Sequence, residues 1–372
     1  MRAPAPTRTP APSPSASAPG PVDDVRLSPQ ALNRTLLRRQ HLLERTGASV
    51  VEECRHLLGL QAQERLPPFL SLAARLSSFD PDDVTRGLED RSLVRLLTMR
   101  GTVHLLAAED VGLRAFTATV HEREIRASQN VGTARDVDRA AFLAALDEVL
   151  AGGPLPQRAI GAALAERFPD HPATRLGQLA RSAAPLVQLP PRGTWRGAGG
   201  VVYDRADRWT GRPLDAPAPE DVVRRYLRAF GPATAADVTA WSAVTRLGPV
   251  VAAMGDLVVH EDEDGRTLYD VEGAPLAAGD EPAPVRLLGT YDNVWLSHAR
   301  RDRVTAPGAR DAWSGVNGAS AMTLFVDGWL TGLWHVVEGR VVVLETLRDL
   351  TRAERDDLAE ESARVEALLA TR

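Results

Sequence analysis

The order of the predicted elements repeats along the chain, and this repeat restricts the fold more than any other feature of the sequence. Gly153-Pro154 and Gly231-Pro232 each stand before two helical segments, which are followed by two short strands joined by a turn. Helical segments also come before residues 92–106, an apolar hairpin pattern around Arg100-Gly101. Helices followed by a hairpin are typical of a winged helix. The sequence therefore predicts an α+β protein built on three tandem winged-helix units.

Composition and helix-capping residues indicate where the predicted domains begin and end. Residues 1–24 contain seven Pro among Ala, Ser and Thr, and we expect disorder because such a segment cannot bury enough apolar surface. Ser28 followed by Pro29 predicts the start of the first helix. Apolar runs between 284 and 347, including Val294–Leu296, are expected to be strands of a small sheet or barrel. The predicted divisions are a disordered 1–24, winged-helix units at 25–135, 136–215 and 216–280, a β domain at 281–350 and a C-terminal helix at 351–372.

Composition excludes several classes of protein. All 44 basic residues are Arg, so lysine-based Schiff-base catalysis is excluded. The single cysteine, Cys54, excludes an internal disulfide framework and a cysteine-built metal site. No apolar run approaches the ~20 residues of a membrane span, and the N-terminus has no apolar core of the signal-peptide kind. We expect a cytoplasmic protein with no membrane partner and, since a Walker-type phosphate loop is also missing, no cofactor.

Charge is distributed unevenly. The chain carries a net charge of -5, yet residues 255–281 hold nine acids against Arg266 alone, and residues 351–372 are also acidic. The remainder is mildly basic and can offer a local basic surface to a polyanion. Four arginines of the second unit are candidate DNA contacts: Arg175, Arg181, Arg192 and Arg196. The alternative is that they are solvated surface cations, since Arg is the only cationic side chain in use.

Gln61-Ala62-Gln63 is the strongest candidate for chemistry. Gly59 interrupts the preceding helix, so these three residues are expected to be extended. Positions two apart in an extended chain point the same way, which would turn both amides toward one cavity with Ala62 behind them. The alternative is a pair of glutamines that cap backbone groups of a loop.

Histidines are weaker candidates. His104 lies in the predicted first-unit hairpin and His298 in the predicted β domain, and either could line a channel. The alternative for both is a hydrogen-bonded structural histidine. The other histidines show no ligand spacing, so no metal site is predicted.

A set of short motifs occurs in a particular order between about residues 27 and 350. They are Ala31-Leu32-Asn33-Arg34, Arg39-Gln40, Leu58-Gly59-Leu60-Gln61-Ala62-Gln63, Arg100-Gly101-Thr102-Val103-His104, Tyr226 to Pro232, Tyr291-Asp292-Asn293, Ser297-His298 and Arg301 to Val304. No single motif is specific, but the ordered set resembles the AlkZ/YcaQ-type winged-helix DNA glycosylases. The long Pro-rich N-terminus departs from that pattern and leaves the motifs untouched.

The resemblance implies a fold, a partner and a site. The family has tandem winged helices and a β domain around a DNA channel, and its members remove alkylated bases. Its catalytic motif is Gln-aliphatic-Gln in the AlkZ branch and ends in Asp in the YcaQ branch, so Gln61 and Gln63 match the AlkZ branch. That branch is associated with self-resistance to DNA-alkylating natural products. Arg301 and Arg303 are expected to contact DNA, and the expected partner is double-stranded DNA with an alkylated purine, bound by a monomer.

Two neutral amides suit one kind of leaving group. An amide carbonyl can hold a water near the anomeric carbon, and its dipole can stabilise an oxocarbenium-like centre. An N7-alkylated guanine is already cationic and departs neutral, so no general acid is required. We therefore predict a monofunctional DNA glycosylase for bulky cationic N7-alkylpurine adducts, a range that could include interstrand crosslinks. The alternative is a non-catalytic winged-helix regulator, although the chain has no coiled-coil heptads for the dimer that a regulator usually forms.

Borohydride trapping tests the consequence of having no lysine. Reduction of a reaction with N7-methylguanine DNA should leave no covalent enzyme–DNA adduct, because no side-chain amine can form an imine with the abasic sugar. A denaturing gel separates free from cross-linked DNA, and a lyase-active glycosylase serves as the positive control. A trapped adduct would reveal another amine, such as the N-terminus, and contradict the prediction.

Overall fold

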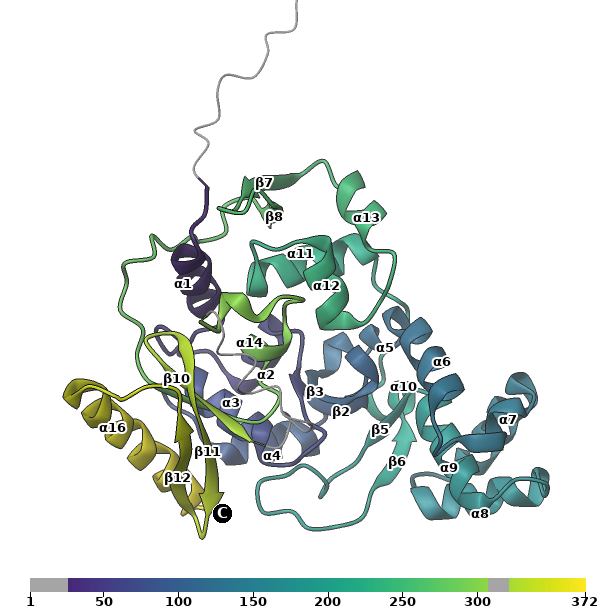
Figure 1. Ribbon diagram of the computed structural model, residues 1–372. Coiled ribbons are helices and arrows are strands. Elements are labelled where there is room, and N and C mark those ends of the chain that lie inside the picture. The colour runs from purple at the N-terminus through teal and green to yellow at the C-terminus, as the bar shows by residue number, and fades with distance from the viewer. Residues whose placement is uncertain (1–25, 307–320) are drawn as a thin grey trace, which may run out of the picture.

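The computed structural model describes residues 26–306 and 321–372, so the segment 1–24 that was predicted to be disordered lies outside the described residues (Figure 1). The helix start expected at Ser28 is confirmed, because the Ser28 hydroxyl accepts the Ala31 N–H at 3.1 Å, and Asp80 caps α4 in the same way by accepting the Asp82 N–H at 2.9 Å. The elements up to residue 136 are α1 (Pro29–Arg39), α2 (Val50–His56), β1 (Leu60–Gln61), α3 (Pro67–Arg75), α4 (Pro81–Glu89), β2 (Leu93–Leu97), η1 (Met99–Gly101), β3 (Val103–Ala107), η2 (Ala108–Asp110), α5 (Leu113–Phe116), α6 (Ala118–Ala127) and η3 (Gly132–Asp136).

The middle of the chain has the predicted succession of helices and hairpins. The elements of 136–215 are α7 (Arg139–Leu150), β4 (Leu155–Pro156), α8 (Gln157–Arg167), α9 (Ala173–Ala183), β5 (Leu186–Gln188), β6 (Val202–Arg205) and α10 (Ala206–Thr210). Those of 216–280 are α11 (Pro219–Phe230), α12 (Ala235–Ser242), α13 (Gly248–Ala253), β7 (Leu257–Glu261) and β8 (Thr267–Val271). The hairpin predicted at 92–106 is confirmed as β2 and β3. The α+β class is therefore confirmed.

The C-terminal region contains the predicted small sheet, which is open rather than a barrel and has the strand order β12-β11-β10-β9. The prediction of a strand at Val294–Leu296 is wrong, because Asp292 accepts the Val294 N–H at 3.0 Å and caps a short helix there. A helix cap thus decides the conformation of an apolar run that alone favours a strand. The elements are β9 (Arg286–Leu288), α14 (Asn293–Leu296), η4 (Arg301–Arg303), β10 (Met322–Val326), β11 (Trp329–Val337), β12 (Arg340–Thr346) and α16 (Arg352–Leu369).

One sheet joins the first two predicted units. Its strand order is β1-β3-β2-β5-β6-β4, and β2 pairs antiparallel with both β3 and β5, placing Arg95 opposite Gln188. Every residue of β2 is buried, so the backbone groups on both of its edges need partners. The predicted boundary between 135 and 136 therefore does not divide the sheet. In contrast, β7 and β8 form a hairpin of their own.

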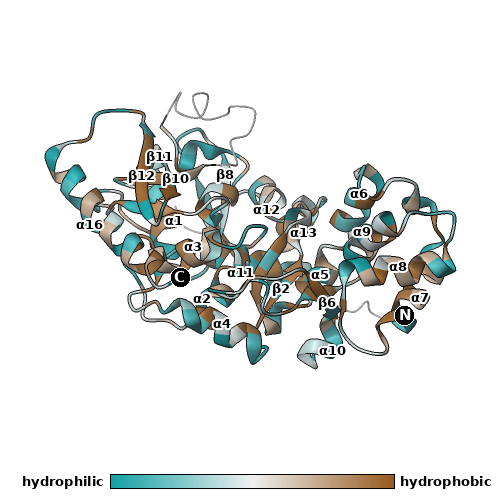
Figure 2. Ribbon diagram, turned by 90° about the horizontal axis from the view of Figure 1, so that it is seen from below, coloured by the Kyte–Doolittle hydropathy of each residue, from teal (hydrophilic) through white to brown (hydrophobic). Residues whose placement is uncertain are grey.

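The molecule is elongated when it is seen from below (Figure 2). The β10–β12 sheet and α16 lie at one end, α7 and α8 lie at the other, and β2, α2 and α11 lie between them. A large apolar core joins this middle region and includes Met99, Leu106, Val187, Tyr226 and Trp241. No helix of the described segments is long and apolar enough to cross a membrane.

Helix α1 is held by polar side chains that are buried. The Arg39 guanidinium makes a two-point ion pair with Asp270 at 2.8 and 2.7 Å and also donates to the Leu227 carbonyl at 2.8 Å. The Asn33 amide donates to the carbonyls of Arg303 and Gly328, both at 2.9 Å. These contacts bind α1 to α11, β8 and the β domain at once, and the fixed directions of the hydrogen bonds define how these parts are oriented.

A second buried ion pair links α3 to the start of α14. Arg75 donates to both carboxylate oxygens of Asp292 at 2.8 and 2.7 Å, and the Ser71 hydroxyl adds a third bond at 2.6 Å. Burial alone would raise the pKa of Asp292, but Arg75 and these hydrogen bonds hold it below its usual range. Arg75 also reaches the Gln40 amide oxygen at 3.2 Å, and the Gln40 NH₂ donates to the Ala229 carbonyl at 2.6 Å.

Replacement of Asp292 by Ala should be strongly destabilising. It leaves the buried Arg75 guanidinium without the carboxylate that it bonds at two points, and with the Glu53 carboxylate at 4.0 Å; removing one partner of a buried pair typically costs about 3–5 kcal/mol of unfolding free energy. Urea denaturation followed by circular dichroism gives the measurement. The matched control is Glu148→Ala, which removes an exposed ion pair with Arg167 and should cost less than about 1 kcal/mol. Equal losses in the two variants would contradict this assignment.

Candidate active site

The predicted motif begins in β1, the edge strand of the central sheet, but only Gln61 lies in that strand, and the chain bends at Gln63. Gln61 pairs with His104 of β3, and the Ala62 N–H donates to the Val103 carbonyl at 2.7 Å. Ala62 is fully buried, as expected for a residue that packs behind the motif. The two glutamines lie at different depths, because Gln61 is only 8% exposed whereas the Gln63 side chain is exposed.

The turn that leads into the motif is sterically defined. Leu58 and Gly59 both have left-handed backbones, with φ of 54° and 96°. A Cβ at Gly59 would lie 2.4 Å from a Leu106 methyl carbon and 3.1 Å from the Leu105 carbonyl oxygen, so only glycine fits. The Asn293 amide donates to the Gly59 carbonyl at 2.8 Å and ties the turn to α14. The β domain therefore helps to position β1.

Arg100 is in direct contact with the motif. Its Nη2 donates to the Gln61 Oε1 at 3.0 Å and lies 3.3 Å from the His104 Nε2, while its Nη1 donates to the Trp241 carbonyl. Burial and then the charge of Arg301 lower the pKa of Arg100 to about 10, so it remains a cation at neutral pH.

Arg95 supports the backbone of the same motif from β2. Its Nη2 donates to the Ala62 carbonyl at 2.7 Å, and the Gln188 amide oxygen lies 3.4 Å away. Burial, then the charges of Arg192 and Arg65, lower the pKa of Arg95 to about 10. Among the residues that the structure describes, neither Arg95 nor Arg100 has a carboxylate in ion-pair contact.

Sequence reasoning did not identify either arginine as a site residue. The sequence places Arg100 in a hairpin turn and in one motif of the family resemblance, without a role at the site, and it does not single out Arg95. A signal exists for Arg95, because it is the single charge in the apolar strand Leu93–Leu97. A charged residue in a fully buried strand indicates a specific partner or a function.

His104 is part of the site, but as a neutral hydrogen-bonding group. Its Nδ1 lies 3.0 Å from the Thr102 carbonyl and its Nε2 faces Arg100, so Nδ1 carries the proton and Nε2 accepts. Burial and the charge of Arg100 lower the pKa of His104 to about 3. The imidazole therefore carries no acidic proton for a leaving group at neutral pH.

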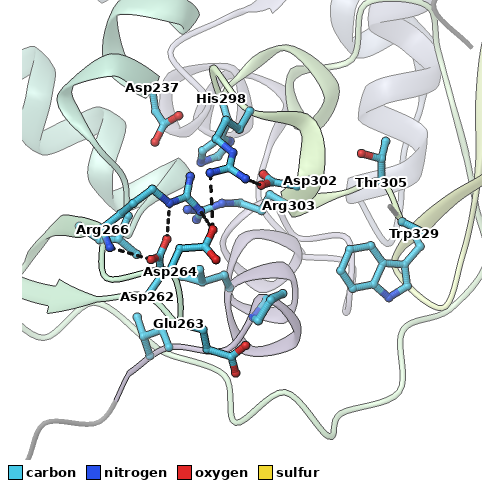
Figure 3. A pocket seen from close by; sticks show the side chains of 16 residues that line it. Asp237, Asp262, Glu263, Asp264, Arg266, His298, Asp302, Arg303, Thr305 and Trp329 are labelled. Atoms are coloured by element: carbon cyan, nitrogen blue, oxygen red, sulfur yellow. Dashed lines mark hydrogen bonds and ion pairs between the residues drawn. The ribbon is translucent and has the colours of Figure 1, made fainter. Parts of the chain in front are cut away.

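His298 and Arg303 lie elsewhere, in the wall of a cavity of about 580 Å³ whose lining includes neither Gln61 nor Gln63 (Figure 3). The His298 Nδ1 is 2.9 Å from the Ser297 hydroxyl, and its Nε2 is 3.2 Å from the Phe230 carbonyl. Arg303 is 9% exposed and donates to the Pro232 carbonyl at 2.7 Å. Both side chains thus make buried contacts within the fold.

The same cavity includes the acidic turn between β7 and β8. Arg266 pairs with Asp262 at 2.7 Å, and Arg300 pairs with Asp264 at 3.5 Å (Figure 3). These ion pairs put both positive and negative side chains in the lining of the cavity, which therefore differs from a basic phosphate site. No group of three or more His, Cys, Asp or Glu side chains in the described segments is arranged to hold a metal ion.

The remaining predicted arginines divide into two groups. Arg192 and Arg301 lie close enough to the motif for their charges to lower the pKa of Arg95 and Arg100, and the Arg301 guanidinium lies over the Trp295 ring, 5.2 Å from its centre. Arg175 and Arg181 lie on α9, and the exposed Arg196 pairs with Asp82 of α4 at 2.9 Å. DNA contact by any of them stays a prediction.

Comparisons with known proteins identify a family and a similar fold. The family described as DNA glycosylase AlkZ-like matches residues 54–368. An interstrand DNA cross-link repair glycosylase from Streptomyces sahachiroi is 29% identical over 326 residues, which cover 82% of this chain and 87% of the relative. The solved structure of Streptomyces sahachiroi DNA glycosylase AlkZ is similar with a TM-score of 0.78 at 24% identity, covering 93% of this chain and 98% of that one.

Buried histidines should make the fold sensitive to mild acid. Burial is the largest cause that lowers the pKa of His104 and His298 to about 3 and that of His121 to about 2. The unfolded chain takes up protons at these residues below about pH 6.5, whereas the folded chain does not until about pH 3. The free energy of unfolding should therefore decrease as the pH falls through this window, by at most about 1.4 kcal/mol per pH unit for each histidine.

Urea midpoints at pH 7.5, 6.5 and 5.5 measure this dependence. His121→Leu is the matched variant, because it removes one of the three protonation sites away from the motif and should make the pH dependence shallower. A midpoint that does not change between pH 7.5 and 5.5 would mean that these histidines are not buried in their neutral form.

Proposed function

Because the chain belongs to the AlkZ-like DNA glycosylase family, we propose that it hydrolyses the N-glycosidic bond of bulky cationic N7-alkylpurine adducts in DNA and leaves an intact abasic site. The observation that carries this proposal is the pair of amides at Gln61, buried on β1, and Gln63, exposed just beyond the strand, with no acidic proton on the neighbouring His104. A site of this kind favours a leaving base that already carries positive charge.

The proposed chemistry follows from the lesion. Alkylation at N7 puts a positive charge on the purine, so cleavage of the bond to C1′ releases a neutral base and leaves an oxocarbenium-like sugar. Water then adds to C1′ and gives up a proton. The motif would position the water and stabilise the positive sugar through an amide oxygen, whereas undamaged purines would leave as anions and their departure would gain little from this help.

Charge around the motif supports DNA as the partner. The chain as a whole carries -5, yet Arg95 and Arg100 both bond the motif. The charges of Arg65 and Arg192 act on Arg95, and that of Arg301 acts on Arg100. Such a local positive potential favours the approach of a phosphate backbone. We propose that the protein binds double-stranded DNA as a monomer, with Arg192 and Arg301 as the predicted phosphate contacts nearest the site.

The biological context is proposed from the relatives. The similar Streptomyces sahachiroi protein is named for interstrand DNA cross-link repair. A crosslink between two N7 atoms presents the same cationic purine on each strand, so the chemistry that removes one adduct would also unhook a crosslink. Gln63 is exposed, which leaves room for a bulky adduct at that side of the motif. We propose repair of such damage, as self-resistance to a DNA-alkylating natural product.

Lesion charge is the decisive test. Under single-turnover conditions, DNA that contains N7-methylguanine or larger N7 adducts should be cleaved at the lesion after heating in alkali. DNA that contains 1,N6-ethenoadenine, uracil or 8-oxoguanine should be nearly unchanged, because general acid help is typically worth 10²–10⁴-fold and this site offers none. Comparable rates on the neutral lesions would show that an acid has been overlooked.

The glutamine variants are the control for this experiment. Gln61→Ala and Gln63→Ala should each lower the rate on N7-methylguanine at least ~10-fold, since the loss of one positioning or electrostatic group usually costs 10²–10³. Their affinity for the lesion DNA should stay near that of the parent chain. Full activity in the double variant would remove the motif from the mechanism.

A further inference from the structure

We propose that Arg100 is a positioning residue that fixes the Gln61 amide with its NH₂ group toward the substrate, so that Gln61 acts as a hydrogen-bond donor and Gln63 as the acceptor for the water. The two glutamines would then have different roles within one motif. This inference rests on the proposed glycosylase function, and it assigns a different role to each glutamine of the site.

The direction of the Gln61 amide follows from the chemistry of its partner. A guanidinium has only donors, so the atom that faces Arg100 at 3.0 Å has to be the Gln61 oxygen. The nitrogen on the other branch of the amide then points away from Arg100. Gln61 is 8% exposed. If its amide were rotated by half a turn, the Gln61 NH₂ would face the Arg100 guanidinium, and two hydrogen-bond donors would meet in a buried place.

Arg100 is itself fixed on several sides. Its Nη1 is bound to the Trp241 carbonyl of α12, and the lone pair of the His104 Nε2 faces its Nη2 at 3.3 Å. The backbone of Arg100 is left-handed, with φ of 54°, in the turn between β2 and β3. A Cβ on the following Gly101 would lie 2.9 Å from the Glu124 side chain, so α6 closes this turn from outside. The guanidinium therefore has one defined orientation.

Gln63 is held far more loosely. Its side chain is exposed, and among the described residues its one hydrogen bond comes from the Val103 N–H to its Oε1 at 3.5 Å, the upper limit of such a bond. The amide can therefore rotate and present its oxygen to a water. A water that attacks C1′ needs an acceptor for its protons, which Gln63 supplies and the fixed Gln61 does not.

An NH₂ group of Gln61 that points away from Arg100 suits an acceptor atom of the damaged nucleotide. An unprotonated ring nitrogen or an oxygen of the purine or sugar can accept this hydrogen bond, and the bond strengthens if electron density moves onto the base as it departs. A donor in a nearly buried place is a preorganised group of the kind that usually contributes 10²–10³ in rate.

A double-mutant cycle tests whether Arg100 acts through Gln61. Arg100→Met should lower the single-turnover excision rate of N7-methylguanine by roughly 10- to 100-fold, with the affinity for lesion DNA unchanged within about twofold. In the Gln61→Ala background the same replacement should cost less than about twofold more. Losses that multiply in the double variant, or a loss of DNA affinity alone, would overturn the proposal.

Two further variants separate positioning from folding. Arg100→Lys keeps one donor for the Gln61 oxygen and should recover part of the rate lost in Arg100→Met. Arg340→Met is the matched control, because Arg340 is 74% exposed on β12, pairs only with Glu366 among the described side chains and lies outside the site. Thermal midpoints of all variants report whether each one folds. A lysine variant that folds and is no better than the methionine variant would count against the proposal.

Carboxylate replacements separate donor from acceptor. Gln61→Glu loses the NH₂ group and gains an ion pair with Arg100, so it should be as inactive as Gln61→Ala from pH 5 to 8. Gln63→Glu keeps an acceptor, and its rate should rise with pH as the carboxylate ionises near its ordinary pKa of about 4.3. A Gln61→Glu chain that is faster than Gln61→Ala would show that Gln61 works as an acceptor instead.

A measurement that does not depend on excision activity distinguishes this inference from the proposed function. The ¹⁵N-labelled side-chain amide of Gln61, assigned by its loss in Gln61→Ala, should resonate away from the free-amide position and move back to it in Arg100→Met. If the shift occurs while the parent chain excises no lesion, the proposed function fails and the contact stands. If the parent chain excises the lesion and the resonance does not move, the positioning role fails and the function stands.

Discussion

Buried guanidinium groups are the constraint on which the rest of the structure depends. Arg39 and Arg75 are almost fully removed from solvent, and each needs a carboxylate at two fixed points and a carbonyl or amide oxygen as well. Because a charge left without these partners would be costly, the segments that carry Asp270 and Asp292 have to meet α1 and α3 in one geometry. Segments more than 200 residues apart in the chain are therefore placed by charge as much as by apolar packing.

This constraint reaches the motif through one further step. Asp292 caps α14 and receives Arg75, and the next residue, Asn293, bonds the Gly59 carbonyl at 2.8 Å. The strand that begins at Leu60 is thus anchored from behind by the β domain and from the side by β3. Arg95 and Arg100 complete the support from the hairpin. The candidate site is therefore held by residues that act on Gln61 and Ala62 and have no assigned contact with the reacting atoms.

Local signals made much of the fold predictable, and non-local pairing accounts for what was missed. Ser28, Asp80 and Gly59 act on their neighbours, so helix starts and the end of α2 follow from the sequence. The strand expected at Val294–Leu296 failed because the cap at Asp292 outweighs an apolar run. The pairing of β2 with β5 could not be foreseen, since nothing near either strand specifies a partner 93 residues away. At the site, the spacing of Gln61 and Gln63 was visible, whereas the roles of Arg95 and Arg100 depend on which carbonyls the fold brings to them.

The sheet shared by the first two units has a mechanical consequence. Hydrogen-bonded strands run from β1, which carries the motif, to β4 and β6, which pack beside α8 and α10, so no hinge separates the motif from the helices of the second unit. A protein without a hinge at this point cannot close around a duplex by moving these two parts toward each other. The duplex would have to bend or unstack instead, and lesions that weaken stacking would then be reached at lower cost than intact base pairs.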